Sequence, residues 1–236
     1  MMRVRIIGAG RAGTSLHRAL TRAHWPVEPL AGRGDSTADA AASVDLVVVA
    51  TPDASIAQVA AAIAPSPDAV VAHLSGSLGL AALAGHERRA VLHPLVALPD
   101  AERGADRLIG AWFGLAAEGD PLVEDVVDEL HGRVVRVAEV DWARYHAAAV
   151  IAANHLVALM GQVERVAGSV GAPLDAYLDL ARGSLDDVAV LGPAGALTGP
   201  VRRGDTATVQ RHLDALPEGE RATYRALAEE AARLCQ

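Results

Sequence analysis

The segment RVRIIGAGRAG, residues 3–13, decides the fold. Its first five residues form a short apolar run that predicts a β-strand, and a helical pattern follows over residues 11–23. The glycines between them match the pattern G-x-G-x-x-G, in the residues Gly8-Ala9-Gly10-Arg11-Ala12-Gly13. A glycine-rich turn that leaves a strand and opens a helix is the setting in which this pattern indicates a dinucleotide site.

Each glycine of this turn has a physical role. Gly8 permits the tight turn, Gly10 lets a pyrophosphate approach the backbone, and Gly13 lets the helix pack closely on the strand. The helix N-terminus offers free N–H groups to phosphates. We therefore expect the cofactor to contact Gly8, Gly10, Arg11, Ala12 and Gly13. The alternative is a glycine turn in a Rossmann-like fold that binds no nucleotide.

The type of dinucleotide depends on the residue that ends the second strand. NAD-specific sites carry an acid there, about 20 residues after the glycines. This chain has Arg33 in the segment GRGDST, residues 32–37. A guanidinium group can donate two parallel hydrogen bonds to a 2′-phosphate, with Ser36 beside it, so we expect NADP rather than NAD. The alternatives are that Arg33 is simply solvated, or that Asp35 binds the ribose of NAD.

Strands and helices alternate through the first 140 residues, which predicts a doubly wound, Rossmann-type parallel sheet. The run DLVVVA is apolar throughout, as in a parallel strand buried on both faces. Ligands of such sheets bind beyond the carboxyl ends of the strands, so we expect Thr51, Pro52 and Ser75 to contact the cofactor and Asp53 to cap a helix. Further strands are expected at 27–31, 45–50, 69–74, 90–92, 111–117 and 133–137, and helices at 55–63 and 121–130.

No strand is expected after about residue 140. One long helix is predicted over 142–170, and a loop or broken helix over the glycine-rich segment 192–204. Shorter helices are expected near 174–182, 206–216 and 218–234. The expected organisation is thus an α/β dinucleotide-binding domain, residues 1–140, followed by a smaller all-helical domain for substrate binding and dimerisation, residues 141–236.

Composition narrows the function. The chain has 236 residues, is 51% hydrophobic and carries a net charge of −8, which argues against nucleic acid or an anionic membrane as the partner. Its longest apolar stretch, 147–161, is interrupted by Asn154 and His155 and is expected not to span a bilayer.

The single cysteine, Cys235, leaves no internal disulfide and suits the cytoplasm. The apolar long helix exceeds what a small domain can bury, which predicts a homodimer through residues 141–236.

Several motifs together resemble one family. They are GAGRAG, DLVVVATPD, HLSG, LHPL (Leu92–Leu95), YHAAAVIAANHLVAL (Tyr145–Leu159) and LTGPVRRGD (Leu197–Asp205). They cover nearly the whole chain, and the last two are the specific ones. The family is the Rossmann-like proteins with a C-terminal helical domain of unassigned function, similar to the 6-phosphogluconate-dehydrogenase-like reductases, which include pyrroline-5-carboxylate reductase, ketopantoate reductase and β-hydroxyacid dehydrogenases. The resemblance implies NAD(P) binding, pairing of two subunits through the helical domain, and reduction of a C=O or C=N group in the cleft between domains.

The chain departs from these relatives in one respect. β-Hydroxyacid dehydrogenases use a helix with a catalytic lysine four residues before an asparagine; if Asn154 is that asparagine, the lysine position is Val150. No lysine occurs anywhere in the chain, so neither that mechanism nor the lysine-dependent mechanism of ketopantoate reductases can operate.

Other polar residues are candidates for the chemistry. His93 ends a short strand, and its ordinary pKa suits proton donation near neutrality. On the long helix, His146 and Asn154 would line one broad groove at 3.6 residues per turn. We expect these three as catalytic residues, and Tyr145, Thr198 and Arg202 as substrate-binding residues, the arginine holding a carboxylate. The alternatives are that the histidines are structural, that the asparagine is buried and hydrogen-bonded to a neighbouring helix, and that the arginine is solvated.

These observations favour an NADP(H)-dependent oxidoreductase that reduces the C=O or C=N group of a small carboxylate-bearing metabolite without a catalytic lysine. The alternative is a non-catalytic NADP(H)-binding sensor or partner protein, which the missing lysine motivates. A methyltransferase on a similar sheet is the weakest reading, because that class places an acid at the end of the second strand, where this chain has Arg33.

Overall fold

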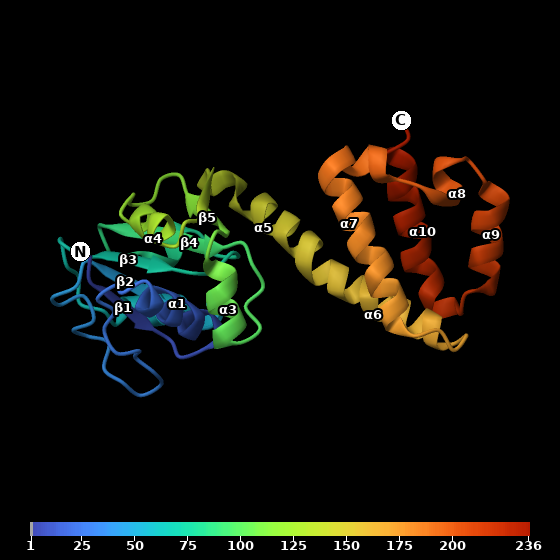
Figure 1. Cartoon of the computed structure of the whole chain (residues 1–236). Coiled ribbons are helices and arrows are strands. Elements are labelled where there is room, and N and C mark those ends of the chain that lie inside the picture. Colours follow the sequence, from blue (N-terminus) through green and yellow to red (C-terminus); the bar gives the residue numbers. More distant parts are fainter. Residues whose placement is uncertain (1) are drawn as a thin grey trace. The chain divides into compact units, whose positions relative to one another are not determined.

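The computed structural model describes residues 2–236 and divides the chain into two compact units (Figure 1). The first ends at Ala153 and the second is Asn154–Gln236. The shift in composition along the sequence had predicted a domain boundary at residue 140. The units divide later because α5 (Trp142–Val150) belongs to the first unit, where Trp142 is 3% exposed in a cluster with Leu80 and Val91.

The first unit is built on one six-stranded sheet with the order β1-β2-β3-β4-β5-β6. Helices connect the strands, as the alternating pattern predicted. The strands are β1 (Val4–Ile7), β2 (Leu46–Val49), β3 (Val70–His73), β4 (Arg89–Pro94), β5 (Trp112–Ala116) and β6 (Arg133–Val137). The helices are α1 (Arg11–Arg22), α2 (Asp53–Ala61), α3 (Ala101–Leu108) and α4 (Val123–Glu129), with short 3-10 turns at Leu80–Leu83 and Glu139–Asp141.

Both faces of the sheet are covered, which explains the continuous apolar strands. Leu46 and Val48 of β2 pack in the core that α1, α3 and α4 complete. Val47 and Val49 point to the other face, where they pack with α2. Successive side chains of a strand alternate between faces, so a strand buried on both sides needs an apolar residue at every position, and β2 is fully buried.

The sheet is not parallel throughout. β1 to β4 are parallel to one another, but β4 and β5 pair antiparallel, and β6 is parallel to β5. The doubly wound parallel sheet predicted from the sequence is confirmed, and the antiparallel β4–β5 pair is its one departure from parallel pairing among the described strands. After β4 the chain enters α3, a helix that was not predicted from the sequence. It then returns so that the Leu95 N–H donates to the Trp112 carbonyl at 2.8 Å. β5 therefore starts at the edge where β4 ends.

The strand expected at residues 27–31 is reduced to two isolated parallel bridges with β1, Val4 with Val27 and Ile7 with Ala31. It lies on the side of β1 opposite β2. Prolines interrupt it, since they donate no backbone hydrogen bond. The chain thus runs first to one side of β1 and then to the other, which makes the carboxyl end of β1 a topological switch point, the place where open α/β sheets bind ligands.

The second unit is helical. It contains α6 (Leu156–Gly168), α7 (Leu174–Ala196), α8 (Gly199–Arg202), α9 (Thr206–Ala215) and α10 (Glu218–Arg233). The helix expected at 174–182 is longer than predicted, and α7 joins two helical segments across a break at Gly192, whose φ of +71° and ψ of 166° are not helical; Pro193 follows the break. The long helix 142–170 is interrupted by a π-helical turn, Ile151–His155, between α5 and α6.

The stretch Glu139–Gly168 is, by length and composition alone, apolar enough to cross a membrane, and its apolar window is 0% buried. The expectation that it could not span a bilayer considered only residues 147–161, whereas the helical stretch continues on both sides. α7 is equally uncovered, with no buried residue along its length. Exposed apolar surface of this extent on the described helices is typical of an interaction surface.

Candidate active site

The glycine turn has the geometry that its sequence predicted. Gly8 has φ +120°, and a Cβ there would lie 2.6 Å from the Ala50 carbonyl carbon. A Cβ on Gly13 would lie 1.9 Å from the Gly8 oxygen, so Gly13 is required for the helix to pack on the turn. Gly10 differs, because nothing lies within 4 Å of its Cβ position. Gly10 also precedes α1 without any side chain capping the helix N-terminus, so free N–H groups face open space, as a pyrophosphate site requires.

The segment that carries Arg33 lies beside this turn. The Gly8 N–H donates to the Ala31 carbonyl at 2.8 Å, which fixes the following residues at the same sheet edge. Asp35 accepts the Gly32 N–H at 2.7 Å and so closes a local turn. Arg33 and Ser36 are exposed, and within the described chain the Arg33 guanidinium has no hydrogen-bond or ion-pair partner. The Arg33 side chain is therefore available to a ligand phosphate.

Two further loops follow β2 and β3. Ser77 donates to the Asp53 carboxylate at 2.5 Å and joins the two loops. Ser75 Oγ accepts the N–H groups of Ser77 and Leu78. The expectation that Asp53 caps α2 is wrong: Pro52 occupies the N-cap position, and the carboxylate accepts from Ser77 instead.

Thr51 joins this loop pair to the glycine turn. Its backbone nitrogen lies 2.9 Å from the Cβ position of Gly8, and its Oγ1 is buried without a hydrogen-bond partner. An orphaned buried hydroxyl is uncommon in folded proteins and is a candidate ligand contact. The glycine turn, Thr51, Pro52 and Ser75 thus share one edge of the sheet, as the sequence predicted.

A cluster of ring side chains lies at the next strand. His93 Nδ1 is 2.8 Å from the Tyr145 hydroxyl, and the His93 and His146 rings meet edge to face with centroids 5.7 Å apart. Two glycines make the space: a Cβ on Gly76 would lie 2.4 Å from His146 Nδ1 and 2.6 Å from His93 Nε2, and a Cβ on Gly114 would lie 2.2 Å from the Tyr145 oxygen. The three ring residues were predicted from the sequence, and the two glycines were not.

Burial sets the charge state of this cluster. It lowers the pKa of His93 to about 4, and the nearby His146 adds to the effect, while the Asp53 carboxylate opposes it. Burial also raises the pKa of Tyr145 to about 12. His93 is therefore neutral at physiological pH, and the expectation that its pKa suits proton donation near neutrality is wrong.

A third histidine stabilises the loop without taking part in the cluster. His73 is fully buried, with burial lowering its pKa, and its two ring nitrogens pair with the Gly79 carbonyl and the Ser75 N–H. Both nitrogens are satisfied by the backbone, so His73 has the structural role of holding residues 75–79 in place.

The remaining expected site residues lie outside the first unit. Asn154, Thr198 and Arg202 belong to the second unit. Asn154 is exposed in the π-helical turn, where the 3.6-residue spacing used to align it with His146 does not hold. Thr198 lines a hollow in the helical unit, and Arg202 is exposed.

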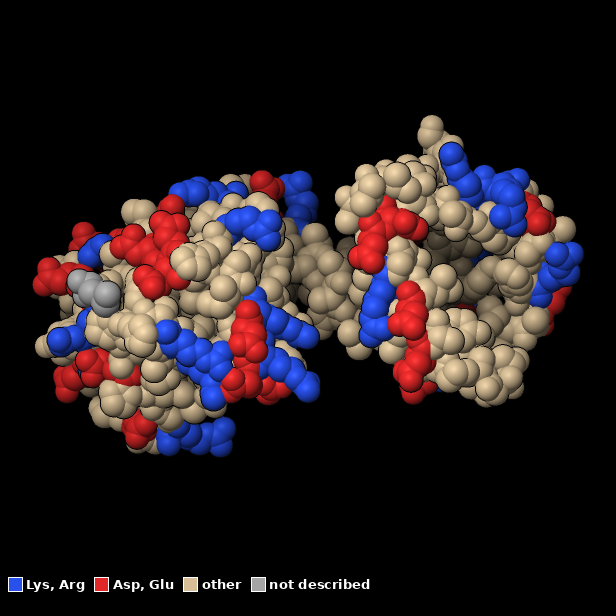
Figure 2. All heavy atoms as spheres, viewed as in Figure 1, with Lys and Arg blue, Asp and Glu red and all other residues tan. Residues whose placement is uncertain are grey.

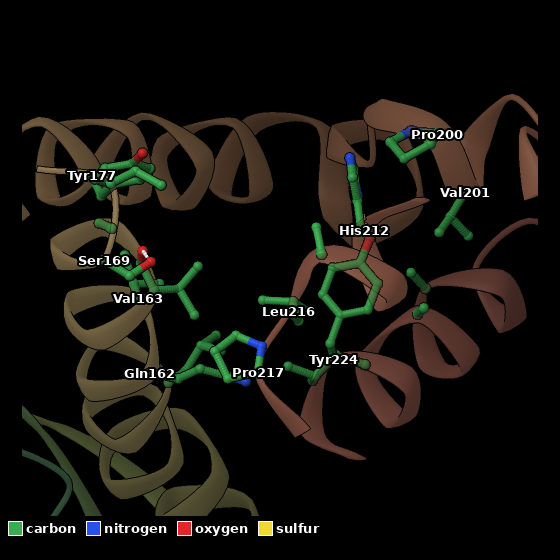
Figure 3. A pocket seen from close by; sticks show the side chains of 18 of the residues that line it. Gln162, Val163, Ser169, Tyr177, Pro200, Val201, His212, Leu216, Pro217 and Tyr224 are labelled. Carbon is green, nitrogen blue, oxygen red and sulfur yellow. Dashed lines mark hydrogen bonds between the residues drawn. The ribbon is translucent and has the colours of Figure 1, made fainter. Parts of the chain in front are cut away.

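That hollow was not foreseen from the sequence. It has a volume of about 650 Å³, its walls are mainly apolar side chains of α6, α9 and α10, and its opening is visible in Figures 2 and 3. Polar groups at its edge are already paired: His212 Nδ1 lies 2.7 Å from the Tyr224 hydroxyl, and Gln162 donates to the Glu220 carbonyl at 2.9 Å. It therefore offers apolar surface and few free polar groups.

The sheet with its glycine turn and the added helical unit define a Rossmann-type α/β protein with a C-terminal helical domain, as the sequence resemblance implied. Residues 112–231 match the family described as Domain of unknown function (DUF2520), and the chain belongs to that family. No curated protein sequence matches the chain significantly.

Solved structures share the fold over almost the whole chain. A Bacteroides fragilis protein, provisionally named an NADP oxidoreductase, is 20% identical, with 98% of each chain covered and a TM-score of 0.80. Protein TM1727 from Thermotoga maritima is 23% identical, again with 98% of each chain covered, and has a TM-score of 0.77. A reductive aminase from Aspergillus terreus, solved with NADPH and ethyl levulinate, is 17% identical, with 99% of this chain and 94% of that chain covered and a TM-score of 0.72.

Proposed function

We propose that this chain is an NADP(H)-dependent oxidoreductase that reduces a C=O or C=N group of a small metabolite. The observation that carries the proposal is the shared sheet edge: the open backbone at Gly10 follows β1, the unpaired Thr51 hydroxyl follows β2, and His93 lies near the end of β4, in the same set of parallel strands. The names of two structural relatives, an NADP oxidoreductase and an aminase solved with NADPH, are consistent with it.

In this proposal Gly8, Gly10 and Gly13, together with the N-terminus of α1, hold the pyrophosphate, and Arg33 and Ser36 bind the 2′-phosphate. Thr51, Pro52 and Ser75 contact the nicotinamide side. The bound cofactor supplies a hydride. The protein orients the acceptor through His93, His146 and Tyr145, and Thr198 and Arg202 remain proposed substrate contacts.

A non-catalytic NADP(H)-binding sensor is the second candidate. Two observations favour it: the chain has no lysine, and His93 is neutral and hydrogen-bonded to Tyr145. A sensor would bind the cofactor without turnover of any carbonyl or imine compound.

We further propose that the chain works as a cytoplasmic homodimer formed through the helical unit. α7 exposes Leu180, Leu185, Val190 and Leu191, all more than half accessible. Apolar side chains on one helix and an apolar hollow on the same unit are complementary surfaces that a second copy can cover. The same pairing would cover the exposed apolar face of α6.

Calorimetric titration with NADPH and NADH tests the cofactor site. Wild type is expected to bind NADPH at least tenfold more tightly than NADH, a difference of about 1.4 kcal/mol. Arg33→Ala should remove that difference, and Arg103→Ala, which removes another exposed arginine of the first unit, should preserve it. If neither nucleotide binds, the glycine turn is only structural and the proposed function is wrong.

A further inference from the structure

The side chains next to His93 at the carboxyl end of β4 are exposed. Trp112 opens β5 and stands two residues before Gly114, which pairs with His93 across the antiparallel β4–β5 ladder. Side chains two residues apart in a strand point to the same face, so Trp112 is on the face that carries the His93 cluster. With strands about 4.8 Å apart and a rise of about 3.4 Å per residue, the Trp112 and His93 Cα atoms are roughly 8 Å apart.

Trp112 presents apolar surface at this end of the sheet. It is 41% exposed, whereas Phe113 and Leu115 of the same strand are buried. Leu95, which is 38% exposed, lies beside it, and the Leu95 N–H donates to the Trp112 carbonyl at 2.8 Å. Neighbouring exposed apolar side chains are typical of a binding surface. This surface is one strand away from the position at which the proposed function places the reduced group.

A positive charge is held over the Trp112 ring. Arg133 of β6 pairs with Trp112 of β5, and its Cζ lies 4.6 Å from the centroid of the indole. One guanidinium N–H donates to the Gly110 carbonyl at 3.3 Å. Arg136 of the same strand pairs with Glu124, but Arg133 has no ion pair within the described residues. Stacking on an aromatic ring orients a guanidinium and leaves its edge free to donate hydrogen bonds, so Arg133 is available to an anion.

We propose that Arg133, stacked on Trp112, is the specificity-determining residue that binds a carboxylate of the substrate, and that this carboxylate lies several carbons away from the group that is reduced. The inference rests on the proposed function, which places the reduced group beside His93. A carboxylate on the reduced carbon itself is too close to reach Arg133 from there. A chain of several methylene groups spans the interval, and its apolar surface can lie on Trp112 and Leu95.

Three probes separate the effect of charge from that of length. 6-Oxoheptanoate has a ketone and a remote carboxylate, 7-hydroxyheptan-2-one has a hydroxyl group in place of that carboxylate, and pyruvate has its carboxylate on the carbonyl carbon. Each is titrated by NMR into the full chain saturated with NADP⁺. Wild type is expected to bind 6-oxoheptanoate at least tenfold more tightly than either other probe. Binding should shift the Trp112 indole N–H signal, which is assigned by its loss in Trp112→Phe.

Variants of three arginines locate the carboxylate. Arg133→Gln keeps a hydrogen-bond donor but removes the charge, and should abolish the preference for 6-oxoheptanoate over the hydroxyketone. Arg107→Gln is the matched control, because Arg107 is also exposed, donates to a backbone carbonyl, that of Ala97, and pairs with no carboxylate among the described residues; it should retain the preference. Arg202→Gln should retain it too. Equal melting temperatures verify that all three variants are folded.

The outcomes separate the two proposals. Absence of NADP⁺ binding overturns the proposed function and this inference together. With NADP⁺ bound, four results overturn the inference alone: no binding of 6-oxoheptanoate, equal affinity for the three probes, an unshifted Trp112 signal, or a preference that survives Arg133→Gln. Loss of the preference in Arg202→Gln, with Arg133→Gln unaffected, would assign the carboxylate to the helical unit instead.

Discussion

Burial of His93 makes the stability of the fold depend on pH in a defined window. The ordinary histidine pKa of 6.5 falls to about 4 in the folded chain. Above pH 6.5 both the folded and the unfolded chain hold a neutral His93. Between pH 6.5 and 4 the unfolded chain binds a proton that the folded chain does not, so His93 destabilises the fold increasingly as the pH falls.

The magnitude follows from the size of the shift. At 1.36 kcal/mol per pKa unit, the full shift corresponds to about 3 kcal/mol at low pH, and about 2 kcal/mol is lost by pH 5. The variant His93→Asn removes the titrating ring and keeps a polar atom near the Nδ1 position, within reach of Tyr145. Between pH 7.5 and 5 wild type should therefore lose about 2 kcal/mol more stability than this variant.

Urea denaturation at several pH values, followed by circular dichroism, measures this difference. His73 also has a lowered pKa, but it is present in both proteins and cancels in the comparison. The control is His24→Asn, because His24 is exposed and has φ +60°, which asparagine tolerates well. Parallel pH curves for wild type and His93→Asn would show that His93 is not held neutral, and the argument about its charge state would fail.

Three further results are expected. Gly76→Ala should lower the free energy of unfolding by about 1–3 kcal/mol and shift the NMR signals of the cluster histidines, whereas Gly183→Ala, with nothing within 4 Å of its Cβ position, should do neither. Gly10→Val should abolish nucleotide binding and leave the fold intact, because nothing lies within 4 Å of the Gly10 Cβ position. Gly13→Ala should lower the melting temperature markedly, because its Cβ would lie 1.9 Å from a backbone oxygen. Equal melting temperatures for these two variants would contradict the packing argument. Leu185→Glu on α7 should convert a dimer to a monomer in light scattering, and a wild-type monomer at micromolar concentration would refute the dimer.

Local patterns allowed most elements of the first unit to be predicted. β2 and β3 are recognisable because a strand buried on both faces is apolar at each position, and the glycine turn because its backbone geometry excludes other residues. The antiparallel pairing of β5 was not predictable in this way. Strand direction depends on the path of residues 95–111, and the run that forms β5 is apolar in either direction.

The sequence predicted which residues belong to the candidate site better than it predicted their contacts and charge states. His93, Tyr145 and His146 were named as polar residues near a sheet edge or on the long helix, but their contact depends on α5 packing against the first unit. The neutral state of His93 depends on burial, which no local pattern reveals. Asp53 was assigned to a helix cap because it precedes the helix predicted at residues 55–63. In the structure it is the first residue of α2, and only the neighbouring loop shows that Ser77 donates to its carboxylate.

The departure from a uniformly parallel sheet is also what builds the ring cluster. Antiparallel pairing of β4 with β5 places Gly114 directly beside His93. Because Gly114 has no side chain, the Tyr145 hydroxyl occupies the space its Cβ would fill and reaches His93 Nδ1 at 2.8 Å. On the other side Gly76 leaves the same kind of space for His146. A larger residue at either glycine would separate the rings, so the chemistry of this edge depends on two glycines outside the nucleotide motif as directly as the dinucleotide site depends on Gly8 and Gly13.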